Sequence, residues 1–95
     1  MPIAISASEA TYSVGSSAVR LDASPTSNRF WVQVVNPSDV YRVFVGYDSN
    51  VGTANHQCAD PSFGIWEMPV NSQVPIWVKA ESGTITVRFI EYRSA

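Results

Sequence analysis

The sequence contains only one cysteine (Cys58), one histidine (His56) and one leucine (Leu21) in 95 residues. A lone cysteine cannot close an internal disulfide, which excludes the class of small secreted domains that are held together by disulfides. A single histidine leaves few ways to build a metal site or a nucleophile–base pair. The scarcity of leucine argues against a helical core, because leucine is among the strongest helix formers.

Charge is also scarce. Charged residues make up 15% of the chain, and six basic against eight acidic side chains give a net charge of −2. The basic residues are scattered, so the sequence predicts neither nucleic-acid binding nor a basic helix on a membrane surface. The first 14 residues hold no Lys or Arg, and no run of about 18 apolar residues occurs, so neither a signal peptide nor a membrane span is predicted. We therefore expect synthesis in a cytoplasm.

The abundant residues are β-branched: 13 Val, 6 Ile and 5 Thr. Such side chains suit the pleated surface of a strand, and the composition predicts an all-β protein. A length of 95 residues corresponds to one domain. Residues 1–17 are rich in Ser and Ala and are predicted to form an extended N-terminal arm, followed by a β domain over 18–95.

Alternating apolar and polar residues predict strands over 18–21, 29–36, 40–47, 65–70, 73–80 and 84–93. The sequence NPSD at 36–39 is typical of a tight turn, so the two flanking strands are predicted to pair as a hairpin. Phe30, Val32 and Val34 are expected on one face. Residues 48–64 are predicted to be a long loop. The pattern as a whole indicates a small antiparallel β-sandwich or barrel of six to eight strands.

Few residue groups could carry chemistry. His56, Cys58 and Asp60 are conceivable metal ligands, but a structural zinc site needs four ligands and no further His or Cys exists. The sequence DSN at 48–50 lacks the rest of a calcium-binding loop and is better explained as a turn. No motif places a base beside a nucleophile. The sequence therefore predicts no enzyme, no catalytic residue, no cofactor and no metal.

Aromatic residues are more informative. A small sandwich needs some of the three Trp and four Tyr for its core, yet both types are also favoured at interfaces and on sugar-binding faces. Trp66 follows the long loop, and Trp77 is predicted to face away from Val74, Ile76 and Val78. These two tryptophans are the candidate aromatic contact residues.

Three segments resemble small β-sandwich accessory proteins of tailed-phage virions: AVRLDASPTSNRFWVQVVN, VFVGYDSNVGTAN and VPIWVKAESGTITVRFIE. The resemblance covers roughly residues 18–91 and rests on strand and turn patterns such as WVKAESGT. It implies a capsid decoration or cement protein, a head fibre, or a tail module. Decoration proteins of this kind sit as trimers on the capsid exterior and clamp major capsid subunits. The sequence HQCADPSFG at 56–64 departs from the family pattern, which has a simpler Gly-Pro-Gly turn.

The sequence thus predicts a structural virion protein on the capsid exterior, with the major capsid protein and further copies of itself, as a homotrimer, for partners. Protein contacts are predicted at the arm, the 56–63 loop and the two tryptophans: Ile3, Ile5, Tyr12, His56, Phe63, Trp66 and Trp77. Two alternatives remain open. One is a carbohydrate- or receptor-binding module of a fibre or tail, and the other is a neck or tail adaptor.

Overall fold

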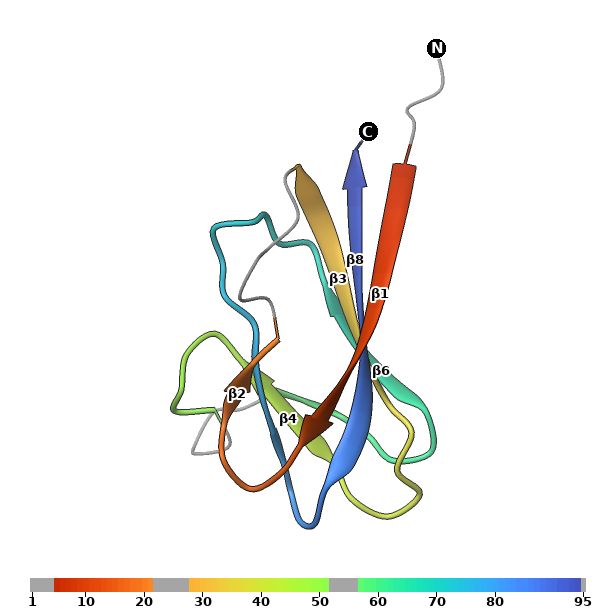
Figure 1. Ribbon diagram of the computed structural model, residues 1–95, viewed down its shortest axis with the longest axis vertical. Helices are drawn as coiled ribbons and strands as arrows, with labels where there is room; N and C mark the ends of the chain where they lie inside the picture. Colours follow the sequence, from red (N-terminus) through yellow and green to blue (C-terminus); the bar gives the residue numbers. More distant parts are fainter. Residues whose placement is uncertain (1–4, 22–27, 52–56, 95) are drawn as a thin grey trace.

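A computed structural model describes residues 5–21, 28–51 and 57–94 and consists of two four-stranded antiparallel sheets (Figure 1). The long sheet has the order β1-β8-β3-β6, and the short sheet has the order β2-β7-β4-β5. The strands are β1 (Ile5–Val14), β2 (Val19–Arg20), β3 (Arg29–Asn36), β4 (Val43–Gly46), β5 (Gln57–Ala59), β6 (Gly64–Met68), β7 (Trp77–Ala80) and β8 (Ile85–Ser94). The all-β prediction is confirmed. None of the described residues forms a helix long and apolar enough to cross a membrane.

The core lies between the two sheets. In β8, Ile85, Val87 and Phe89 are buried and alternate with exposed neighbours, as the sequence pattern predicts. Val43 and Val45 of β4 and Val78 of β7 supply the opposite wall from the short sheet. The burial of small β-branched side chains between two sheets is the arrangement of a small sandwich.

The predicted hairpin between β3 and β4 is wrong. β3 pairs with β6 and β8, whereas β4 pairs with β5 and β7, so the NPSD segment at 36–39 carries the chain from one sheet to the other. β3 and β4 each bury the side chains on one face of the strand. These two buried faces meet across the core because the strands lie in opposite sheets. The predicted loop over 48–64 also differs from the structure, because β5 pairs with β4 as an edge strand.

Residues 5–14 of the N-terminal segment form a strand of the long sheet and not a separate arm. β1 pairs with β8 over ten residues, from Ile5 opposite Ser94 to Val14 opposite Ile85 (Figure 1). Val14 is fully buried, and Tyr12 packs edge-on against Phe89 with ring centroids 6.5 Å apart. Polar Ser and Thr residues hid this strand from the sequence pattern, since its pairing with β8 comes from backbone hydrogen bonds that any residue supplies.

β3 contains an irregularity that sequence alternation could not reveal. Arg29 lies opposite Arg93 and Trp31 opposite Tyr92, so Phe30 is an extra residue in a β-bulge. The bulge turns Phe30 away from the face of Val32 and Val34, and its side chain is 42% exposed. The prediction that these three residues share a face is therefore wrong for Phe30.

Candidate interaction surface

One end of the sandwich presents exposed apolar side chains from the β3–β4 connection and from the adjoining segment at the start of β6. Val40 and Tyr41 come from the β3–β4 connection, and Phe63 and Ile65 flank the start of β6. We call these four residues the loop-end patch. Phe63, a predicted contact residue, is 62% exposed. An exposed apolar group of this kind is typical of a surface that binds another molecule.

Asn36, at the end of β3, holds the two loops together. Its side chain is fully buried, and its Nδ2 donates to the carbonyl oxygens of Tyr41 (2.8 Å) and Ala59 (3.0 Å). Its Oδ1 accepts the Ser38 N–H at 3.0 Å, and its backbone carbonyl accepts the Phe63 N–H at 2.8 Å. A buried residue with these partners positions the backbone of Tyr41 and Phe63, two of the four patch residues.

The backbone that presents Phe63 is strained. Ser62 and Phe63 have φ angles of 64° and 63°, in the left-handed region that bulky residues avoid. The following Gly64 accepts no side chain, because a Cβ there would lie 2.3 Å from the Asp60 carbonyl oxygen. Such strain costs about 1–3 kcal/mol per residue and persists where the surroundings impose it. Here it keeps a phenyl ring at the surface.

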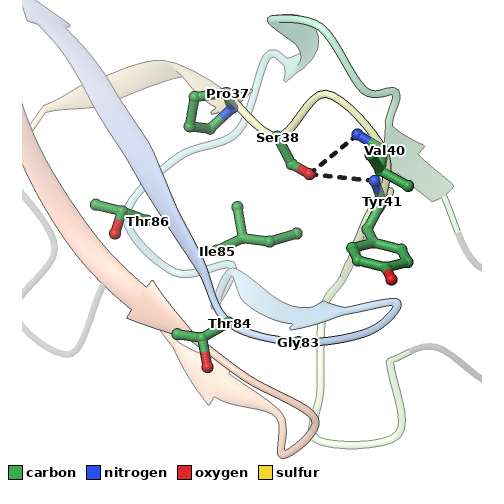
Figure 2. A pocket seen from close by; sticks show the side chains of 8 residues that line it. All are labelled: Pro37, Ser38, Val40, Tyr41, Gly83, Thr84, Ile85 and Thr86. Atoms are coloured by element: carbon green, nitrogen blue, oxygen red, sulfur yellow. Dashed lines mark hydrogen bonds between the residues drawn. The ribbon is translucent and has the colours of Figure 1, made fainter.

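A hollow of about 340 Å³ adjoins the patch, between the β3–β4 connection and the turn into β8 (Figure 2). Figure 2 shows the Ser38 hydroxyl accepting hydrogen bonds from the N–H groups of Val40 (3.3 Å) and Tyr41 (3.1 Å). Gly83, with a φ of 66°, forms the facing turn. The hollow is lined by Pro37, Ser38, Val40, Tyr41, Gly83, Thr84, Ile85 and Thr86. One wall is the β3–β4 connection, and the other is the turn at Gly83 and Thr84 together with the first two residues of β8, so the patch has a concave side.

An ion pair ties the same end to the short sheet. Arg42 contacts the Glu81 carboxylate at 2.7 Å, and the Arg42 N–H also donates to that carboxylate at 3.1 Å. The hydrogen bonds from the Arg42 side chain and backbone hold the pKa of Glu81 below its usual value.

This pair predicts a pH dependence. A lowered folded-state pKa means that the contribution of Glu81 is fully present above the unfolded-state pKa and disappears as the pH falls through the folded-state pKa. The Tm difference between the wild type and Glu81→Gln should therefore be largest near neutral pH and shrink on acidification. Thermal melts across an acid series would measure it. A difference that stays constant down to pH 3 would contradict the prediction.

The other predicted contact residues lie in several environments. Trp66 is a core residue, 6% exposed, whose indole N–H donates to Gln57. Trp77 is half-buried and alternates with buried Val78 on β7, so it faces outward as predicted. Tyr12 packs against the core, and the backbone of Ile5 starts β1. Ile3 and His56 lie outside the described residues.

Sequence reasoning placed Trp66 at the surface because it follows a long loop. The structure buries it because β6 is an edge strand whose inner face meets the short sheet. Its ring lies 6.4 Å from that of Tyr47. A buried indole offers no face to a partner.

The side chains around Cys58, which lies on the edge strand β5, offer little chemistry. The Cys58 thiol lies 3.7 Å from the Asp60 carboxylate, and burial, followed by that carboxylate, raises its pKa. The thiol therefore stays protonated at neutral pH. No group of three His, Cys, Asp or Glu residues suited to a metal occurs among the described residues. The Asn50 N–H donates to the Asp48 side chain at 2.8 Å, the turn that the sequence DSN indicates.

Sequence reasoning missed a second surface on the outer face of the long sheet. Trp31, Gln33 and Tyr92 share that face with Glu67, and hydrogen bonds connect all four. Phe30 joins them only because of the bulge. No local signal marks a bulge in a run of apolar residues, so this cluster could not be read from the sequence.

Comparisons of the chain with family models, curated proteins and solved structures found no match.

Proposed function

We propose that this protein is a structural virion protein, a capsid decoration or cement protein that bridges and stabilises major capsid subunits without covalent chemistry. The loop-end patch docks on the capsid, and Phe63 is its central contact. The virion assignment rests on the resemblance of residues 18–91 to phage accessory proteins. The observation that supports a docking role is the exposed Phe63 on a strained, tightly bonded backbone.

Physical reasoning supports this role for the patch. A clamp needs a rigid body and a preformed apolar contact, because ordering a flexible loop on binding would cost affinity. Asn36 orders the patch in advance, and a central aromatic anchor is the usual hot spot of an interface. Many copies on one shell would turn weak single contacts into strong overall attachment.

The proposal includes a homotrimer on the capsid exterior. A trimer would have a native mass of about 31 kDa, three times 10.4 kDa. Light scattering coupled to size exclusion measures this directly. A monomeric mass would remove the trimer from the proposal and leave the capsid contact to be tested separately.

The variant Phe63→Asn tests the contribution of Phe63 to capsid binding separately from its contribution to folding. Asn tolerates the left-handed region, so this change should stabilise the fold by about 0.5–1 kcal/mol while removing the anchor. We expect Tm to rise by a few degrees and binding to capsids to fall about tenfold or more. Co-sedimentation with heads of the encoding phage that lack this protein would measure binding.

Phe30→Ser is the matched control, because Phe30 is also an exposed phenylalanine but lies near the opposite end of β3. It should leave head binding unchanged. Equal binding by wild type and Phe63→Asn would exclude the patch as the contact, and a wild-type protein that does not bind heads would overturn the decoration role.

The alternative of a carbohydrate- or receptor-binding module depends on Trp66 and Trp77 as the aromatic residues that contact the ligand. Trp66 is buried and cannot stack on a sugar, so that pair does not form an open aromatic face. A neck or tail adaptor would form hexamers or dodecamers, and the mass measurement above distinguishes it from a trimer.

A further inference from the structure

A second hollow, of about 320 Å³, lies on the outer face of the long sheet and is lined by Phe30, Trp31, Gln33 and Tyr92. Its volume is at the lower end of the range for small-molecule sites. Three of its four lining residues are aromatic. None of these three rings stacks on another aromatic ring within the described ranges.

The β-bulge creates this hollow. Regular alternation would place Phe30 toward the core beside Val32, but the extra residue turns it outward beside Trp31. Arg29 is buried instead, where it donates to Glu91 at 2.9 Å and to the Val74 carbonyl at 2.7 Å. Bulges are often found where a side chain is redirected at a functional site. The bulge thus buries Arg29 and exposes its neighbour Phe30.

Hydrogen bonds between side chains hold the polar rim in place. Glu67 Oε1 accepts the Trp31 indole N–H at 2.9 Å and the Gln33 amide N–H at 3.2 Å. Gln33 Oε1 in turn accepts the Tyr92 hydroxyl at 2.9 Å. The Trp31 ring is therefore oriented, and a carboxylate and an amide lie beside it in fixed positions. Neither side chain must be ordered when a ligand binds.

We propose that this hollow binds a single pyranose ring of a glycan. The apolar C–H face of the sugar would lie on Trp31, with Phe30 and Tyr92 beside it. Its hydroxyl groups would donate to the Glu67 carboxylate and exchange hydrogen bonds with Gln33. Aromatic side chains paired with fixed planar polar groups match a ligand with one apolar face and a polar rim.

Two other ligand classes fit the geometry less well. A quaternary ammonium group is bound in a cage of aromatic faces that surrounds it, whereas these rings line a hollow on the surface of a sheet. The centre of a protein interface is depleted of charged residues, whereas the Glu67 carboxylate accepts hydrogen bonds from two residues that line this hollow, Trp31 and Gln33.

The glycan site is independent of the proposed docking function. The two surfaces share no residue, although Ile65 of the loop-end patch and Glu67 of the polar rim are only two residues apart on the outer face of β6, about 7 Å at the usual rise per residue. Either role can fail without the other.

The test uses the full chain and a panel of cellohexaose, chitohexaose, maltohexaose and xylohexaose. Isothermal titration would measure affinity, and NMR would follow the Trp31 indole N–H signal. We expect saturable binding of at least one oligosaccharide at millimolar affinity or better, with a shift of that signal. Trp31→Ala should lower the affinity about tenfold or more, and Glu67→Gln should lower it less.

Trp77→Ala is the matched control, since Trp77 is half-buried on the outer face of the short sheet. Circular dichroism and native mass would show that each variant is folded. Absence of saturable binding to all four sugars at about 10 mM would overturn the proposal. Equal loss in Trp31→Ala and Trp77→Ala, or displacement of the sugar signal by tetramethylammonium, would overturn it as well.

Discussion

Replacing Asn36 with alanine should lower the free energy of unfolding by about 3 kcal/mol or more. The change removes the donor to the Tyr41 and Ala59 carbonyl oxygens and the acceptor for the Ser38 N–H. Each buried polar group left without a partner costs about 1–3 kcal/mol. A domain of this length has a total stability of only about 5–14 kcal/mol, so the loss is a large fraction of it.

Chemical denaturation of the purified variant would measure this loss, and Tm should fall by more than about 10 °C. Asn71→Ala is the matched control. Asn71 is exposed, and among the residues that the structure describes its side chain accepts only the Gln73 N–H, at 2.8 Å in the same turn. We expect it to cost less than about 1 kcal/mol. Similar losses in both variants would show that burial of Asn36 contributes nothing beyond one turn bond.

Asn36→Ala should also weaken any function of the loop-end patch. Without the amide, the Tyr41 and Ala59 carbonyls no longer share an anchor, and the loops can separate. Head binding measured well below the Tm of the variant would therefore fall even in the folded fraction. Unchanged binding per folded molecule would contradict a positioning role for Asn36.

Deleting residues 1–12 should destabilise the fold by about 3–5 kcal/mol rather than merely remove an arm. The deletion removes most of β1 and the Tyr12 ring that packs on Phe89. Burial of one aromatic side chain contributes roughly 1.5–3 kcal/mol, and the lost pairing adds to this. β8 would then become a long unpaired edge, which favours aggregation.

Thermal melts and native mass would report both effects of the deletion. A synthetic peptide of residues 1–14 added to the deleted chain should restore stability by pairing with β8 as an added strand. A scrambled peptide of the same composition is its control. A deleted chain that melts at the wild-type temperature would show that β1 contributes nothing to the sandwich, and the segment would then be free to reach a neighbouring subunit.

Much of the fold could be predicted without coordinates. The β-branched composition predicted an all-β protein, and β3 begins and ends where the pattern places it. The outward direction of Trp77 and the buried face of β8 also follow from alternation. These predictions succeeded because the strand period of two is a local property of consecutive residues. Phe63 was selected as a contact residue from its loop, and the structure exposes it.

The failures share a different physical origin. The hairpin between β3 and β4 was wrong because a tight turn does not specify whether its flanking strands pair or enter opposite sheets. Trp66 is buried because an edge strand packs its inner face on the other sheet. The strand over residues 5–14 was missed because its polar residues give no clear alternation and its partner, β8, lies about 70–90 residues further along the chain.

The sequence by itself thus determined the class of structure, most of the strands and the inward face of the clearest one, because these depend on side-chain type and local alternation. Tertiary structure alone decided which strands pair, where Asn36 joins two loops, and that a bulge exposes Phe30 beside Trp31. These features arise from contacts between residues far apart in the chain, whose free energies no local pattern contains.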